Sequence, residues 1–167
     1  NATIALDTTT NAFTGAVTIT TNDDSGTDAD VTIDGGTTAL ILAASTIDGD
    51  PTVINGNSIT DSGTLTVGGN LAATTDANNG LINLGTLAVD GTVALTTNGS
   101  GNATAVNDAG LTFAASTVGG NLAATATTGN MTCLLYTSDA ADDSLRVNLG
   151  VRRIIKEVDG TVPLTPN

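Results

Sequence analysis

Carboxylates gather most densely in one short stretch near the start of the chain. Residues 22–30 read NDDSGTDAD and contain Asp23, Asp24, Asp28 and Asp30 around a glycine. Spaced carboxylates beside a glycine turn are the oxygen ligands that a hard cation such as calcium prefers, although this spacing does not match an EF-hand loop. The stretch therefore raises two hypotheses, a calcium site or a solvated acidic loop.

A second copy of this stretch provides an internal control. Residues 98–105 occupy the matching position further along the chain and read NGSGNATA, without any carboxylate. Since the repeat persists without the acids, its fold does not depend on a bound metal. We favour the solvated loop, and we assign no metal-ligating, catalytic or cofactor-binding residue and no cofactor to this chain.

The pair Asp48 and Asp50 has the residue type needed for general acid–base catalysis. A lyase or hydrolase acting on a polysaccharide also needs cationic or aromatic side chains to position the sugar, and residues 1–132 contain no Lys, Arg, His, Tyr or Trp. We therefore expect no enzymatic activity. The same region has twelve aspartates and no basic residue, which argues against nucleic-acid binding because phosphate contacts require Lys or Arg.

Threonines at strand positions raise an ice-binding hypothesis, since a flat threonine array on one face of a β-helix can bind ice. The threonines expected to face outward are Thr18, Thr20, Thr96 and Thr97. Matching positions elsewhere hold Ala72, Ala73 and Ala94, so the array is interrupted. We interpret these threonines as ordinary surface residues of strands, for which threonine has a high propensity.

Internal repeats organise the whole region that carries these residues. The octapeptide VGGNLAAT occurs at residues 67–74 and again at residues 118–125, and we expect both copies to take similar positions in their coils. Longer matches, such as VTITTN at residues 17–22 and VALTTN at residues 93–98, define a unit of about seventy residues. Glycine turns at Gly49, Gly69, Gly91 and Gly120 follow one another at spacings of 20, 22 and 29 residues, which predicts about three coils per long unit.

Between the glycine turns, aliphatic residues alternate with Thr or Ala, the pattern of strands with one buried face. We predict an all-β, right-handed parallel β-helix with about 20–29 residues per coil and five to six coils. The small inward residues and the two aromatic residues, Phe13 and Phe113, suit a narrow coil, and asparagines at turn ends, Asn70 and Asn121, are expected to form ladders between coils. The alternative is an antiparallel β-sandwich, since Asn-Gly and Asp-Gly pairs are hairpin signals.

Two strings resemble a known family. Residues 57–71 (NSITDSGTLTVGGNL) and residues 87–93 (LAVDGTV) resemble repeats of filamentous-haemagglutinin-like giant exoproteins, which include two-partner-secretion and autotransporter passengers. The resemblance covers residues 1–132 and implies a right-handed parallel β-helix, export and adhesion. It carries over no functional residue.

The resemblance leads to an expected function, a non-catalytic stalk of a secreted or cell-surface adhesin on the Gram-negative outer surface. Host or neighbouring-cell glycans or proteins would bind through other parts of the parent chain, with no nucleic-acid partner. No membrane span is expected, and exposed coil edges are expected to self-associate. The alternative function is a calcium-binding β-sandwich module of a biofilm or surface-layer protein.

The amino-acid composition of the chain changes after Thr132. The only Cys and Tyr, all four basic residues and the only Glu follow it. Residues 133–155 resemble a translated sequencing adapter. We therefore divide the chain into a β-helical repeat at residues 1–132 and a non-native read-through tail at residues 133–167, the alternative being a genuine segment that caps the solenoid.

Overall fold

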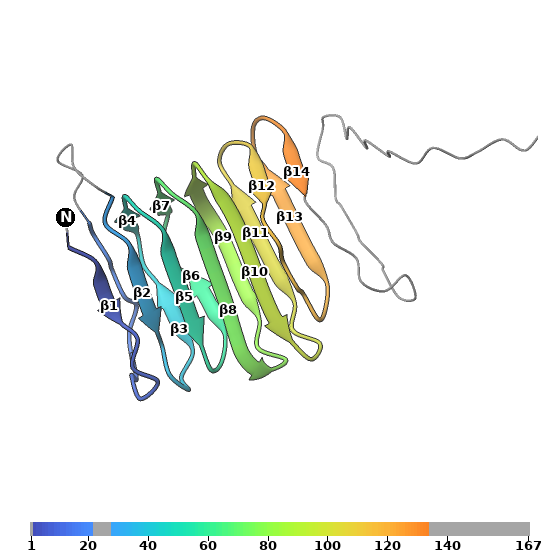
Figure 1. The fold of residues 1–167 in the computed structure, drawn as a ribbon. Coiled ribbons are helices and arrows are strands. Elements are labelled where there is room, and N and C mark those ends of the chain that lie inside the picture. The colour runs from blue at the N-terminus through green and yellow to red at the C-terminus, as the bar shows by residue number, and fades with distance from the viewer. Residues whose placement is uncertain (1, 22–27, 134–167) are drawn as a thin grey trace, which may run out of the picture.

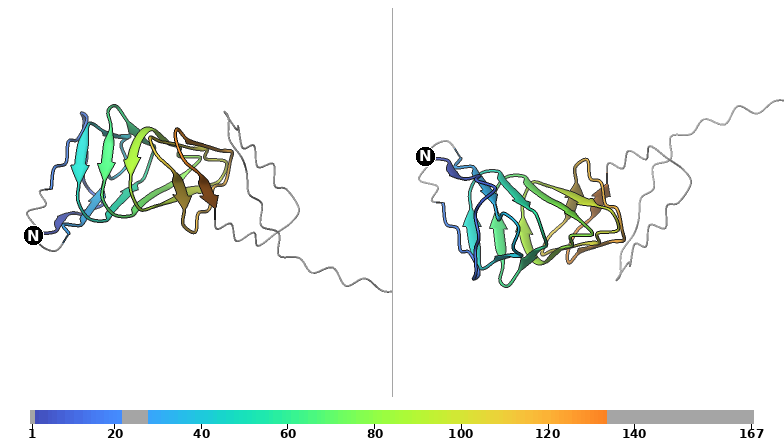
Figure 2. Two further views of the ribbon diagram at one scale, coloured as in Figure 1. Left: turned by 90° about the horizontal axis from the view of Figure 1, so that it is seen from above. Right: turned by 90° about the horizontal axis from the view of Figure 1, so that it is seen from below.

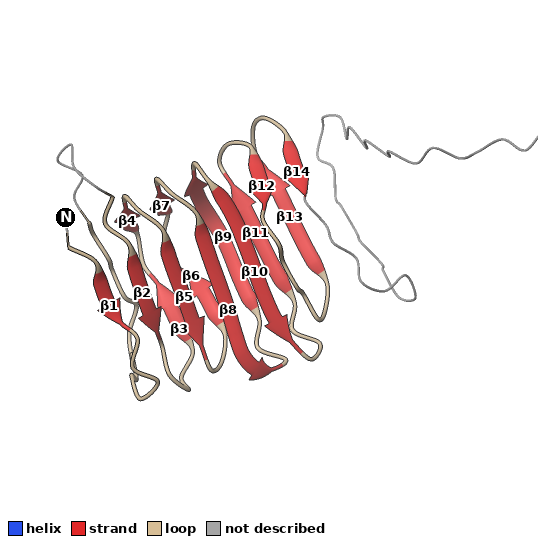
Figure 3. Cartoon of the chain, in the orientation of Figure 1, coloured by secondary structure: helices blue, strands red, loops and turns tan. Residues whose placement is uncertain are grey.

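The computed structural model describes residues 2–21 and 28–133, which are all β and contain no helix (Figure 3). The strands are β1 (Ile4–Leu6), β2 (Val31–Asp34), β3 (Leu40–Leu42), β4 (Ser45–Ile47), β5 (Pro51–Asn55), β6 (Ile59–Asp61), β7 (Leu65–Val67), β8 (Leu71–Asn78), β9 (Ile82–Val89), β10 (Thr92–Asn98), β11 (Ala103–Asn107), β12 (Leu111–Phe113), β13 (Leu122–Ala126) and β14 (Met131–Cys133).

The strands form two sheets that the chain visits in turn. The first sheet has the order β1-β2-β5-β8-β10-β12-β14, and the second contains β3, β6, β9, β11 and β13 together with β4 and β7. In Figure 1 the first sheet lies in front of the second, and the chain advances from one end of the stack to the other. Five coils carry a strand in each sheet, so the structure is a β-solenoid.

All twelve pairings between named strands are parallel. This confirms the predicted parallel solenoid and excludes the antiparallel sandwich. The turns at Asn55-Gly56 and Asp90-Gly91 do not close hairpins, because each carries the chain from one sheet to the other.

Contacts between neighbouring coils give the length of a coil. Along one edge of the stack, Asp50 lies 20 residues after its contact Asp30, and Thr92 lies 22 residues after its contact Asn70. Along the other edge the step is 19 residues from Asn102 to its contact Asn121. The pairing of Val31 with Pro51 and of Ala103 with Leu122 has the same steps in the two sheets. The steps of 20 and 22 residues lie within the predicted range, and the step of 19 residues lies just below it.

Figure 2 shows the stack of coils from above and from below. One hydrophobic core contains buried residues from both sheets. Alternation in most strands places Val, Ile, Leu or Ala inside and mostly Thr, Ala or Asn outside, as in β8, where Leu71 and Ala73 are buried. Each large aliphatic side chain buried in this way stabilises the fold by roughly 1.5–3 kcal/mol. Phe113 is fully buried and Phe13 packs against the core.

The long repeat spans about three and a half coils, not the predicted three. Val17 forms a bridge to Leu42 in the second sheet, whereas its sequence counterpart Val93 pairs with Phe113 in the first sheet. The two copies therefore lie on opposite sheets. The expectation that the two octapeptides take similar positions in their coils is wrong for the same reason: residues 71–74 lie in β8 of the first sheet, and residues 122–125 lie in β13 of the second.

Hydrogen bonds show that the two copies nevertheless have the same local structure. The Ser45 hydroxyl accepts the Ile19 amide at 3.0 Å and donates to the carbonyl two residues before it at 2.8 Å. The Ser116 hydroxyl accepts the Leu95 amide at 3.0 Å and donates to the carbonyl two residues before it at 3.0 Å. A half-turn of the coil thus relates two nearly equivalent surroundings.

The predicted change of character after Thr132 falls at the end of the described chain. Met131, Thr132 and Cys133 form β14, which pairs in parallel with β12. Residues 134–167 lie outside the described residues, and the predicted read-through tail stays a prediction.

Candidate functional site

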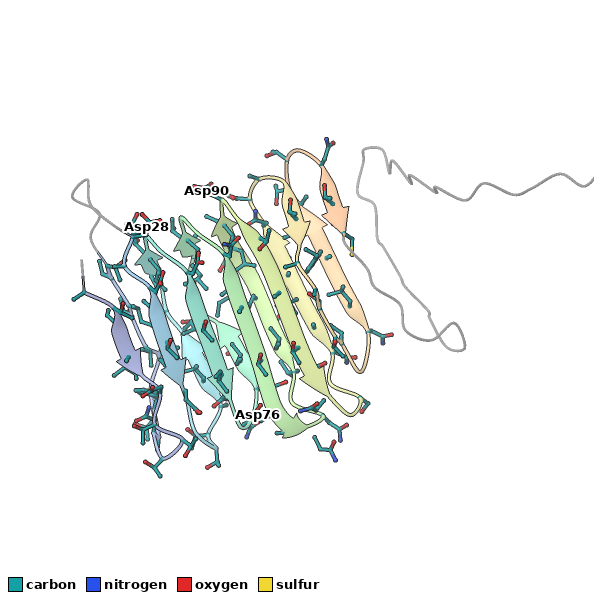
Figure 4. The ribbon with its side chains drawn as sticks, viewed as in Figure 1. Asp28, Asp76 and Asp90 are labelled. Carbon is teal, nitrogen blue, oxygen red and sulfur yellow. The ribbon has the colours of Figure 1, made fainter. Side chains whose placement is uncertain are left out.

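Polar side chains concentrate at the two long edges where the chain crosses between the sheets. We call the edge formed by residues 28–30, 48–50, 68–70, 90–92 and 108–110 the acidic edge. We call the edge formed by residues 55–58, 78–81, 98–102 and 118–121 the amide edge. Figure 4 shows Asp28 and Asp90 on the acidic edge and Asp76 near the opposite one.

A hydrogen-bonded ladder runs along the acidic edge from coil to coil. The Asp30 carboxylate accepts the Asp50 amide at 2.9 Å, and the Asp50 carboxylate accepts the Asn70 amide at 2.6 Å. The Asn70 side-chain oxygen then accepts the Thr92 amide at 2.9 Å and its hydroxyl at 2.8 Å. Each rung fastens one coil to the next through a side-chain oxygen and a backbone N–H, which is stronger when the oxygen is charged.

Glycine precedes three successive rungs of this ladder for a steric reason. A Cβ added at Gly49, Gly69 or Gly91 would collide with backbone atoms of the previous coil and with the oxygen of the preceding ladder side chain. Only glycine leaves room for that oxygen to reach the amide of the next residue. The recurring dipeptide of glycine followed by Asp, Asn or Thr is therefore a coil-joining element.

The amide edge repeats this chemistry with neutral side chains. The Asn79 oxygen accepts the Ser100 amide at 2.8 Å and its hydroxyl at 2.7 Å, and the Asn102 oxygen accepts the Asn121 amide at 2.8 Å. Asparagine ladders therefore exist, but they are not the predicted stack of asparagine side chains, because Asn121 joins its rung through its backbone amide. Their rungs join a side-chain oxygen to a backbone N–H, and Asn70 and Asn121, which share a position in the octapeptide, lie on different edges.

Asp61 holds an irregularity in the second sheet. Its carboxylate accepts the Gly85 amide at 3.0 Å, the Thr86 amide at 2.6 Å and the Thr86 hydroxyl at 2.8 Å. Gly85 and Thr86 are the residues of β9 where its pairing passes from β6 to β7. The charged oxygens satisfy amides that the bend removes from the ladder.

The residues proposed for calcium are only partly placed. Asp23 and Asp24 lie outside the described residues, Asp28 is exposed, and Asp30 belongs to the ladder. Within residues 2–21 and 28–133, no three His, Cys, Asp or Glu side chains come together as a metal site would require.

The structure gives Asp48 and Asp50 separate surroundings. The Asp50 carboxylate contacts both the amide and the side chain of Asn70. The backbone amide of Asp48 donates to the Thr21 hydroxyl at 2.8 Å. Asp50 therefore joins its own coil to the next one.

One of the four threonines predicted to face outward is buried. Thr18 and Thr20 are exposed and Thr96 is half-buried, but Thr97 is only 2% exposed. Its hydroxyl donates to the Gly101 carbonyl at 2.7 Å and accepts the Gly119 amide at 3.0 Å. The prediction was wrong for Thr97 because alternation in a strand turns only one of two consecutive residues outward.

The polar residues that point into the core were not identified from the sequence. Asn55 and Asn107 are fully buried at the ends of their strands and Thr75 is fully buried within β8, and the side chains of all three bond to turn carbonyls. A polar residue in phase with the apolar positions and followed within a few residues by glycine would have identified them. At the far end of the stack, burial raises the pKa of the Cys133 thiol, which makes it a poorer nucleophile at neutral pH.

Comparison with known proteins yields a family match within the solenoid. Residues 28–84 match the model of a family described as repeats of unknown function (DUF5649). The match runs from just before β2 into β9, well under half of the 167-residue chain. No curated protein and no solved structure matches the chain.

Proposed function

We propose that residues 1–132 form a non-catalytic spacer within a secreted or cell-surface bacterial adhesin. The supporting observation is that the residues repeated along the chain are those that build and join coils. The serine bridges at Ser45 and Ser116 recur with the long repeat, and the glycine-led ladder rungs recur along both edges. Such a segment lengthens by adding coils without changing its cross-section.

The chemistry of the described side chains favours a structural role over catalysis. Three carboxylates accept hydrogen bonds from backbone amides of the next coil, namely those of Asp30, Asp50 and Asp61. Residues 1–132 supply no cationic or histidine side chain to assist them. We therefore propose that this segment has no enzymatic activity.

The proposal of export to the outer surface and of adhesion rests on the resemblance to filamentous-haemagglutinin-like repeats, and the match to a family of repeats agrees with the repeat character alone. The twelve aspartates of residues 1–132, which have no basic residue beside them in this region, favour solubility of an extended rod through mutual repulsion. Ligands, whether glycans or proteins, would be bound by other parts of the parent chain. Within the described residues, no helix has the length and apolar character needed to cross a bilayer.

A one-coil deletion in the parent protein tests the spacer function. Removing residues 50–69 joins Gly49 to Asn70, which restores the glycine-led rung and stacks β2 directly on β8. The parent should still reach the surface and support adhesion, with a rod shorter by about 4.8 Å. Surface display that is retained together with a complete loss of adhesion would identify this coil as part of the binding site and contradict the proposal.

A calcium titration separates the spacer from the calcium-dependent alternative. A cation that binds only the folded state raises the melting temperature as its concentration increases. We expect the melting temperature of the chain to be the same in calcium and in chelator. A clear rise that Asp23→Asn and Asp24→Asn abolish would instead assign a calcium site to residues 22–30.

A further inference from the structure

Three Asn-Gly pairs lie in turns of the amide edge, and the structure gives them different surroundings. They are Asn55-Gly56, Asn79-Gly80 and Asn98-Gly99. An asparagine followed by glycine is the sequence in which the next backbone nitrogen most easily reaches the side-chain carbonyl, because glycine has no side chain to obstruct the approach. Whether the reaction occurs depends on the freedom of both groups.

The first two pairs are held in place. Asn55 is fully buried and donates to the Ser58 carbonyl at 2.7 Å, while the Gly56 amide donates to the Gly36 carbonyl at 2.6 Å. In the second pair the Asn79 oxygen accepts two hydrogen bonds from Ser100. The Gly80 amide is buried and donates to the Ala77 carbonyl at 3.1 Å.

The third pair is open. Asn98 is the last residue of β10, and both Asn98 and Gly99 are exposed. Within the described residues the Gly99 amide donates to no backbone or side-chain oxygen. The Asn98 side chain makes only two long bonds, to the carbonyls of Thr75 at 3.3 Å and Asp76 at 3.2 Å.

We propose that Asn98-Gly99 is a site of spontaneous covalent modification, the one Asn-Gly pair of the three at which the folded solenoid deamidates. The Gly99 nitrogen loses its proton to base and attacks Cγ of Asn98. A bond forms between that nitrogen and Cγ, the bond from Cγ to Nδ2 breaks, and Nδ2 takes up a proton and leaves as ammonia. Water then opens the cyclic imide at either carbonyl and gives aspartate or isoaspartate, so base and water are the only co-reactants.

The product weakens the turn that formed it. The side chain of an aspartate at position 98 has no N–H to donate to the carbonyls of Thr75 and Asp76, and its charge would face these two acceptors. An isoaspartate adds a carbon to the backbone next to Asn98, whose carbonyl accepts the amides of Asn79 and Gly101. Modification would loosen one edge at one coil contact.

Peptide mapping by mass spectrometry tests this proposal on the full chain kept in mildly alkaline buffer, folded or in urea. In urea the three pairs should react at similar rates. In the folded chain Asn98 should react fastest, and Asn55 should be slowed at least about tenfold relative to urea, since its reaction requires local opening. The variant Asn98→Gln should remove the product at this turn, because its ring closure is slower.

Equal rates at Asn79 and Asn98 in the folded chain would overturn the proposal, as would slowing of Asn98 to the rate of Asn55. Amide hydrogen exchange provides a second readout. Hydrogen exchange at the Asn79 amide should be faster in the variant Asn98→Asp than in the unmodified chain. Unchanged exchange in this variant would contradict the predicted loosening of the turn.

Discussion

Asn55 and Asn107 occupy equivalent turn positions at opposite edges of the solenoid. Each is the last residue of its strand and is fully buried, and each donates its side-chain amide at 2.7 Å to the carbonyl three residues ahead. They differ in their contacts with the previous coil, where the Asn107 side-chain amide also donates to the Val89 carbonyl at 3.1 Å. The Asn107 oxygen also accepts the Val89 amide at 2.9 Å, whereas the Asn55 oxygen has no hydrogen-bond partner within the described residues.

This difference predicts unequal costs of substitution. Asn107→Ala leaves the Val89 amide, the Val89 carbonyl and the Gly110 carbonyl without the side-chain partner they have now, and should cost about 2–4 kcal/mol. Asn55→Ala leaves only the Ser58 carbonyl without it and should cost about 1–2 kcal/mol. Hydrogen exchange of neighbouring amides measures both costs even if coils open separately. Equal costs for Asn107→Ala and Asn55→Ala would contradict the different hydrogen bonding of the two side chains. The control is Asn57→Ala, because Asn57 is exposed.

The ladder on the acidic edge predicts a steric effect at glycine. Gly69→Ala would place a methyl group against the Asp50 carboxylate and the Gly49 carbonyl, and overpacking of this kind should cost about 1–3 kcal/mol. Gly15→Ala is the matched control, because an added Cβ there has no atom within 4 Å. Urea unfolding followed by circular dichroism measures both variants. Similar stability of the two variants would contradict the steric clash that the structure predicts at Gly69.

The half-turn relation predicts that two serines distant in sequence make equal contributions. Ser45→Ala and Ser116→Ala each remove a hydroxyl that bridges a backbone amide of the previous coil and a carbonyl of its own coil. Each should cost about 1–2 kcal/mol and speed exchange at the Ile19 or the Leu95 amide. The control is Ser62→Ala, whose hydroxyl makes a single long bond of 3.5 Å. A large effect at only one serine would show that the copies are not equivalent.

The sequence was sufficient to predict the parallel solenoid because its signals are local. Alternation in strands such as β5 and β11 specifies an inward face, and glycines mark the crossings between sheets. The hairpin alternative arose because such crossings also use left-handed residues, with φ of +66° at Asn79 and +62° at Gly99. Asn-Gly pairs alone therefore do not distinguish a hairpin from a crossing.

An alignment of the repeats could not predict that the two copies of the long repeat lie on opposite sheets, half a turn of the coil apart. Matching strings identify equal local structure, and a coil with two similar halves offers that structure twice per turn. The octapeptides at residues 67–74 and 118–125 each pass from a turn into a strand, but they enter different sheets. Alternation with Val93 and Leu95 turns Thr97 inward, but the turn groups that bond its hydroxyl there could not be located from the sequence.

Dipolar electron paramagnetic resonance on spin-labelled pairs tests most directly whether the repeat alternates between the two sheets. Ala72 and Ala123 are the same position of the two octapeptides, and Thr52 and Ala94 lie two coils apart in one column of the first sheet. With Cys133→Ser in both samples, the Ala72–Ala123 label distance should exceed the Thr52–Ala94 distance by more than about 10 Å, since the labels leave opposite sheets. Comparable distances for the two pairs would place both octapeptides on one face and contradict the half-turn repeat.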